Sequence, residues 1–109
     1  MWEEKIKMKE YNKLVRDLIP DIIEKDGKQC EVEITDQSNI QMLLEEKMIE
    51  EFNEYLEDKN LEELADMLEV IFGLAHHLGY SEEELIEKRN SKLAERGGFK
   101  QGIVLKKVY

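Results

Sequence analysis

The fold is decided by residues 39–78, which read NIQMLLEEKMIEEFNEYLEDKNLEELADMLEVIFGLAHHL. Apolar side chains recur at helical spacing on both sides of the polar stretch at 58–60. We therefore predict helices over 39–58 and 60–78. Their connection is short, so they should pack antiparallel. The fold class that follows is all-α: an antiparallel helix-hairpin bundle.

Capping signals place further helices on both sides of this hairpin. Ser81 with Glu84 forms a capping-box pattern that opens a helix over 82–96, and two glycines follow it. Segment 13–26 also has helical spacing, and Pro20 either divides it or opens a second short helix. The bundle is therefore expected to have helical neighbours before and after the hairpin.

Two segments predict a small peripheral β element. Residues 30–35 (CEVEIT) alternate apolar and acidic side chains, which is typical of a short strand. The tail at 103–109 (IVLKKVY) is rich in β-branched residues and could pair with it.

Length and composition limit the class of protein. The 109 residues allow a single domain over 1–109, with residues 1–7 (MWEEKIK) expected to be a disordered extension. The single cysteine, Cys30, cannot form an internal disulfide, which favours the reducing cytoplasm. No apolar run approaches the roughly 18 residues of a membrane span, and the N-terminus lacks the apolar stretch expected of a secretory signal peptide. A net charge of −10 argues against a nucleic-acid polymer as partner.

The charge is segregated along the chain. Residues 31–87 carry 18 acidic side chains against Lys47 and Lys59. Residues 88–109 carry seven basic side chains against Glu95. Charge runs are usually solvated helix faces. The alternative is an acidic middle that holds cations beside a basic tail that holds anions, as a metal–phosphate ligand would require.

Four carboxylates are placed level with one another by the hairpin. In helix 39–58, Glu51 and Glu54 lie at the edge of the apolar arc, and in helix 60–78 Glu63 and Asp66 flank it. Glu54 and Glu63 lie at similar distances from the turn, as do Glu51 and Asp66, at 1.5 Å per residue. The spacing alone therefore predicts that the four acids converge beside the seam of the hairpin.

Such a cluster requires neutralisation. Two like charges about 4 Å apart repel by roughly 4 kcal/mol at an effective dielectric constant near 20. Mg²⁺ or Mn²⁺ suits carboxylate oxygens and would remove this repulsion. In the alternative, the acids point outward and pair with Lys47, Lys59 or a partner subunit.

The order of these motifs resembles a known family. Glu50-Glu51-x-x-Glu54 followed by Glu63-x-x-Asp66 is similar to the EExxE…ExxD signature of the all-α, MazG-like nucleoside triphosphate pyrophosphohydrolases, which include phosphoribosyl-ATP pyrophosphohydrolase. Asn90-x-Lys92-x-x-x-Arg96 resembles their substrate-binding segment. The opening YNKLVRDLIP, residues 11–20, resembles that of short, stand-alone members.

The resemblance implies Mg²⁺-dependent hydrolysis between the α- and β-phosphates of a nucleotide, with house-cleaning of (d)NTPs as a purpose. Four acids would hold the metal: Glu51, Glu54, Glu63 and Asp66. Glu50 would be the base that orients the attacking water, or would support the ligands. Candidate contacts to the substrate are Lys47, Asn90, Lys92 and Arg96.

Two questions stay open after the resemblance. Lys13 and Arg16 could touch phosphate or hold a subunit interface. The family implies a homodimer or homotetramer, and a domain of this size covers its apolar helices poorly on its own. The rival hypothesis is a non-catalytic helical oligomer that binds a nucleotide or a partner protein and uses its acids for solubility.

Overall fold

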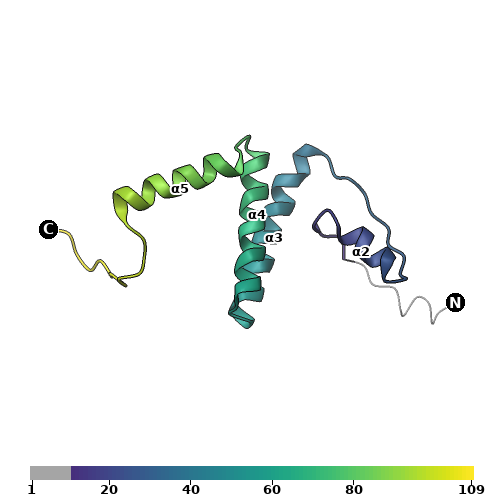
Figure 1. The fold of residues 1–109 in the computed structure, drawn as a ribbon, viewed down its shortest axis with the longest axis horizontal. Helices are drawn as coiled ribbons and strands as arrows, with labels where there is room; N and C mark the ends of the chain where they lie inside the picture. The colour runs from purple at the N-terminus through teal and green to yellow at the C-terminus, as the bar shows by residue number, and fades with distance from the viewer. Residues whose placement is uncertain (1–10) are drawn as a thin grey trace.

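Residues 11–109 are described by the structure, a computed structural model, and they contain four helices and no strand (Figure 1). The helices are α2 (Ile19–Lys25), α3 (Gln37–Glu57), α4 (Leu61–His77) and α5 (Glu82–Arg96). The all-α prediction is confirmed for these residues, and the extension predicted at 1–7 lies outside them. None of the helices among residues 11–109 combines the length and the hydropathy that a membrane span requires.

The centre of the molecule is the predicted hairpin of α3 and α4, which pack side by side (Figure 1). Each helix begins at a side-chain cap. The carboxylate of Asp36 accepts a hydrogen bond from the Asn39 backbone N–H at 3.1 Å, and Oδ1 of Asn60 accepts one from the Glu63 backbone N–H at 3.0 Å. These caps satisfy donors that a helix start leaves unpaired, so the helices begin near the positions that the sequence indicated.

The core of the hairpin is small and depends on one close helix approach. Its buried apolar side chains are Leu44, Val70 and Ala75. A Cβ atom added to Gly73 would lie 3.0 Å from Cδ2 of Leu44, so the missing side chain of Gly73 makes room for Leu44. Leu44 therefore packs directly against the α4 backbone at Gly73.

Truncation of Leu44 should be costly. Leu44→Ala is expected to lower the free energy of unfolding by about 2–4 kcal/mol, because it removes buried methyl groups and leaves a cavity against Gly73. Urea denaturation followed by circular dichroism measures this loss. Met42→Ala is the matched control, since Met42 on the same helix is 53% exposed. An equal loss in both variants would contradict the central place of Leu44.

α5 begins where predicted and leads away from the hairpin. Its start carries the complete capping box of Ser81 and Glu84, and Gly97 follows its end with φ +79°. Among the described helices, α5 packs only against α4, and it projects from the far end of that helix (Figure 1). The molecule is consequently elongated: its radius of gyration is 19.0 Å, whereas a compact domain of this length has about 13 Å.

α2 is the second short helix that Pro20 was expected to open. Pro20 occupies its first turn, where a missing N–H costs nothing, and Gly27 follows with φ +84°. The residues before it, 11–18, form no helix, and residues 17 and 18 make a turn that leads into α2. Within residues 11–109, α2 packs against no other helix.

The predicted β element does not form in the described residues. Segments 30–35 and 103–109 contain no strand, and they lie on opposite sides of the hairpin (Figure 1). Their apolar side chains remain exposed, with Ile34 at 95% and Val108 at 83%. Alternation of side chains makes a strand only when a partner strand supplies hydrogen bonds, and here the two candidates do not meet.

Candidate metal centre

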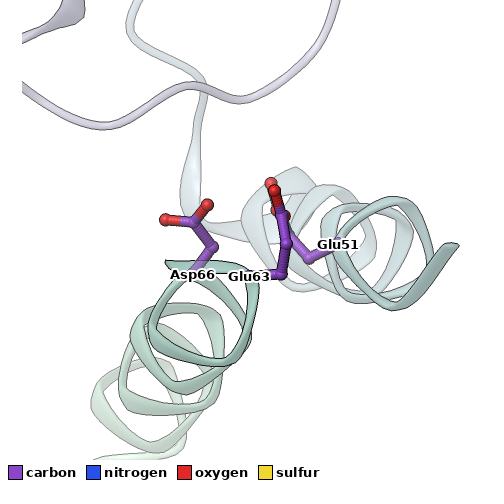
Figure 2. A group of neighbouring side chains, drawn as sticks. All are labelled: Glu51, Glu63 and Asp66. Atoms are coloured by element: carbon purple, nitrogen blue, oxygen red, sulfur yellow. The ribbon is translucent and has the colours of Figure 1, made fainter. Parts of the chain in front are cut away.

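Three of the four predicted carboxylates come together between α3 and α4. Glu51 from α3 and Glu63 and Asp66 from α4 each offer an oxygen, and these oxygens lie within 4.8 Å of one another (Figure 2). A Mg²⁺ ion with bonds of 2.0–2.1 Å holds its oxygens at most about 4.2 Å apart. Small side-chain rotations would therefore close the group around one cation.

The burial of this group is what distinguishes it from an ordinary acidic surface. Glu51 is only 6% exposed, and Glu63 and Asp66 are half-buried. Oε2 of Glu51 and Oε2 of Glu63 are fully covered, and neither accepts a hydrogen bond from any group within residues 11–109. Buried carboxylate oxygens without a donor are costly. A cation between the helices would satisfy both of them.

The fourth predicted ligand borders the group. Glu54 is exposed and is not one of the three acids whose oxygens converge. It is nevertheless close enough to raise the pKa values of both Glu51 and Glu63. Four carboxylates were predicted to converge. Three of them do, and Glu54 lies beside them.

The electrostatics of the site oppose full ionisation without a cation. Burial raises the pKa of Glu51 above its ordinary 4.5, and the carboxylates of Glu54 and Asp66 raise it further, although Lys47 acts in the opposite direction. Burial also raises the pKa of Glu63, and the same two neighbouring acids add to this. A bound divalent cation would stabilise the ionised form of both carboxylates.

A pH dependence of stability follows for the metal-free protein. Because the pKa values of Glu51 and Glu63 are higher in the folded state, that state binds more protons than the unfolded chain just above pH 4.5. The free energy of unfolding should therefore rise as the pH falls from neutrality toward 4.5. Below that value Glu50 acts oppositely, because its pKa is lowered, and stability should fall as it is protonated.

Urea denaturation in EDTA at a series of pH values tests this dependence. Glu51→Gln should flatten the rise between neutrality and pH 4.5, since the substituted side chain does not titrate. An unchanged slope in that variant would show that Glu51 does not cause the effect.

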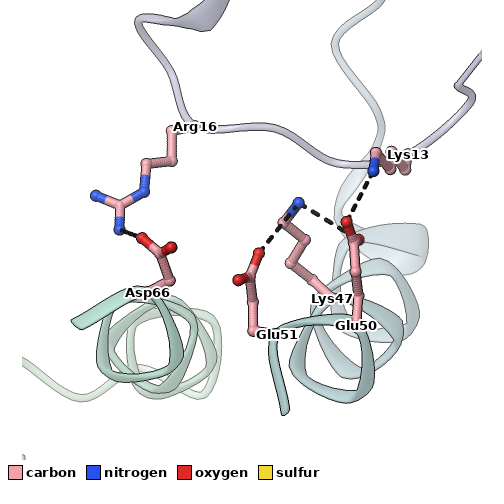
Figure 3. Close-up of polar contacts among 6 residues, drawn as sticks. All are labelled: Lys13, Arg16, Lys47, Glu50, Glu51 and Asp66. Carbon is pink, nitrogen blue, oxygen red and sulfur yellow. Dashed lines mark hydrogen bonds and ion pairs between the residues drawn. The ribbon is translucent and has the colours of Figure 1, made fainter. Parts of the chain in front are cut away.

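Basic side chains surround the acids on one side (Figure 3). Lys47, on α3, contacts Glu50 at 3.4 Å and Glu51 at 3.5 Å, so the predicted alternative of pairing with Lys47 is realised in part. Nζ of Lys13 donates to Oε1 of Glu50 at 2.7 Å. The Lys13 ammonium, with help from Lys47, holds the pKa of Glu50 below its usual value, so Glu50 stays ionised.

Arg16 completes this basic layer, and its position was not derivable from the sequence. Nη2 of Arg16 donates to Oδ1 of Asp66 at 2.7 Å, across 50 residues of sequence (Figure 3). The sequence left the roles of Lys13 and Arg16 open. The sequence carries only a general signal for them: residues 31–87 hold two basic side chains against 18 acidic ones, so some of these acids need partners from other segments.

The predicted substrate contacts on α5 are not brought to the cluster within one chain. Asn90, Lys92 and Arg96 are exposed, and α5 leaves the hairpin at the end opposite to Glu63 (Figure 1). Asn90 instead accepts a hydrogen bond from Arg89 at 3.0 Å. The acids and the basic residues of α5 therefore lie on separate parts of the molecule.

No protein-family model, curated protein or solved structure matches this chain.

Proposed function

We propose that this protein is a Mg²⁺-dependent nucleotide pyrophosphohydrolase that cleaves a nucleoside triphosphate, or a related nucleotide, between its α- and β-phosphates. The products would be the nucleoside monophosphate and pyrophosphate. The observation that carries the proposal is the trio of Glu51, Glu63 and Asp66, which contains two covered oxygens without a hydrogen-bond donor. The type of reaction is inferred from the resemblance of the order of motifs to that of the MazG-like pyrophosphohydrolases.

In this proposal each residue of the cluster has a distinct task. Glu51, Glu63 and Asp66 bind Mg²⁺, with Glu54 as a further ligand beside them. The metal would neutralise phosphate charge and lower the pKa of a bound water. Glu50, whose carboxylate is paired with Lys47, accepts a hydrogen bond from the attacking water and orients it.

A homo-oligomer is the form in which we expect the enzyme to act. The hairpin leaves large apolar side chains exposed on both of its helices, and a single copy is elongated. These side chains include Ile49, Phe52, Leu56, Leu64, Leu68 and Ile71. Because Asn90, Lys92 and Arg96 lie away from the acids of their own chain, they would bind the substrate in the site of a neighbouring copy.

Pyrophosphate release tests this function. The purified protein is incubated with a panel of ribo- and deoxynucleoside triphosphates, once with Mg²⁺ and once with EDTA. We expect metal-dependent release of pyrophosphate with the monophosphate as co-product, and the panel ranks the bases and sugars. Release of orthophosphate instead, or no release from any nucleotide, would contradict cleavage between the α- and β-phosphates.

One observation favours the rival, a non-catalytic helical oligomer. Glu50, Glu51 and Asp66 already have basic partners in Lys13, Lys47 and Arg16, as acids without a metal would need. In the rival, Glu63→Gln is neutral or stabilising and no metal dependence exists. In the enzyme, the same substitution abolishes turnover and leaves the fold intact.

A further inference from the structure

The segment before α2 lies across the acidic cluster. Lys13 and Arg16 are three residues apart, yet they reach different helices: Lys13 contacts Glu50 on α3, and Arg16 contacts Asp66 on α4 (Figure 3). The segment therefore places two cations at the mouth of the candidate metal centre, one on each helix of the hairpin.

These two contacts are of a kind that exchanges readily. The side chains of Lys13 and Arg16 are 42% and 53% exposed, and ion pairs between exposed groups contribute only about 0–1 kcal/mol. Lys47 differs from them, because its side chain is 17% exposed and contacts two carboxylates. Lys13 and Arg16 can therefore change partners at little cost, whereas Lys47 is held in place by burial and by its two carboxylate partners.

Arg16 also has unused capacity for an anion. Only Nη2 of its guanidinium hydrogen-bonds to another group within residues 11–109, and the planar fork carries five N–H donors. Arginine binds phosphate oxygens through two parallel hydrogen bonds. A carboxylate that shares its charge with a divalent cation attracts a guanidinium less than a phosphate does.

We propose that Lys13 and Arg16 form the anion-binding half of the site: they pair with Glu50 and Asp66 in the metal-free protein and move to the phosphate oxygens of a metal-bound polyphosphate. This inference rests on the proposed function, whose metal and substrate it uses. It assigns the segment before α2 to substrate binding. It also predicts that the site binds triphosphates more tightly than monophosphates, because two cations are available to pair with the outer phosphates.

A purely structural role makes a different prediction for the same residues. If Lys13 and Arg16 only clamp the segment onto the hairpin, their removal lowers the melting temperature and leaves affinity for nucleotides unchanged. Metal binding and nucleotide binding must therefore be measured separately.

The test uses the full chain and the variants Lys13→Ala, Arg16→Ala and Arg16→Lys. Isothermal titration calorimetry gives the affinity for Mg²⁺ alone, and then for an α,β-methylene nucleoside triphosphate and for the monophosphate in the presence of Mg²⁺. Arg16→Ala should bind Mg²⁺ up to about fivefold more tightly, because a competing cation is gone. It should bind the triphosphate analogue roughly tenfold or more weakly, since a charge-assisted contact is lost.

The remaining variants complete the comparison. The loss should be smaller for the monophosphate, Arg16→Lys should recover part of the triphosphate affinity, and Lys13→Ala should resemble Arg16→Ala. Lys28→Ala is the matched control, since Lys28 is exposed and contacts only Asp26 among the described acids, at 3.9 Å. Both of its affinities should equal those of the unmodified protein.

The outcomes separate this inference from the proposed function. Unchanged triphosphate affinity in Arg16→Ala, with Mg²⁺ binding intact, overturns the inference and leaves the metal centre standing. Loss of Mg²⁺ binding together with triphosphate binding shows that Arg16 is needed for the metal centre itself and also overturns the inference. If the unmodified protein binds both ligands without hydrolysing any nucleotide, weaker triphosphate binding by the variant still supports the inference, while the proposed hydrolysis fails.

Discussion

Glu51→Gln and Glu63→Gln should each reduce metal-dependent pyrophosphate release on the order of 100-fold or more while the protein stays folded. Both substitutions keep the shape of the side chain and remove the negative charge that a hard cation requires. Electrostatic stabilisation by a metal is worth several kcal/mol, and each 1.36 kcal/mol is a factor of ten in rate. The loss should appear in kcat with saturating nucleotide and Mg²⁺.

A control must show that the loss of activity does not come from unfolding. Burial and neighbouring acids raise the pKa values of both Glu51 and Glu63, so the neutral amides should not lower the melting temperature in EDTA. Glu62→Gln and Glu69→Gln alter exposed acids of α4, the helix that carries Glu63, and these two variants should retain full activity. A loss of activity shared by all four variants would point to overall charge and not to a metal centre.

Mg²⁺ should stabilise the protein against heating. A ligand that binds only the folded state at 100 times its Kd adds about 2.7 kcal/mol. For a chain of this length, that corresponds to a rise in melting temperature of roughly 10 °C. Differential scanning calorimetry in EDTA and in millimolar Mg²⁺ measures the rise, and Mn²⁺ should act similarly.

The same measurement distinguishes specific binding from screening of a charged chain. NaCl at matched ionic strength should shift the melting temperature much less, because it screens exposed charges without satisfying Oε2 of Glu51 and Oε2 of Glu63. The double variant with glutamine at both positions should lose the Mg²⁺-specific part. Equal shifts with Mg²⁺ and with NaCl would remove the support for a metal centre and favour the non-catalytic oligomer.

Much of the fold was predictable because the signals for it are local. The cap at Asn60 and the capping box of Ser81 with Glu84 depend on residues three positions apart, and the structure places helix starts there. The short connection after α3 leaves antiparallel packing as the available arrangement. Within the hairpin, the regular rise of a helix then brings Glu51 level with Asp66, so the core of the site could also be predicted.

The β element was predicted wrongly for a physical reason. Alternating side chains at 30–35 describe one strand, but a strand is stable only in a pair, and nothing local specifies the partner. The direction of α5 is a similar case. The sequence indicated its length and both ends, whereas its contact with α4 alone and its departure from the acids depend on the turn after His77.

The helices, the hairpin and the convergence of acids at its seam were predictable from local sequence, because helical periodicity acts over short distances. Of the four acids predicted to converge, three do so: Glu51, Glu63 and Asp66. The position of Lys13 and Arg16 on this cluster, in contrast, depends on tertiary contacts. Their partners, Glu50 and Asp66, are 37 and 50 residues away, and residues 28–36 between α2 and α3 form no regular element that would fix their position. The contact follows from long-range attraction between a basic segment and a region of high negative charge, which fixes a partner only once the chain has folded.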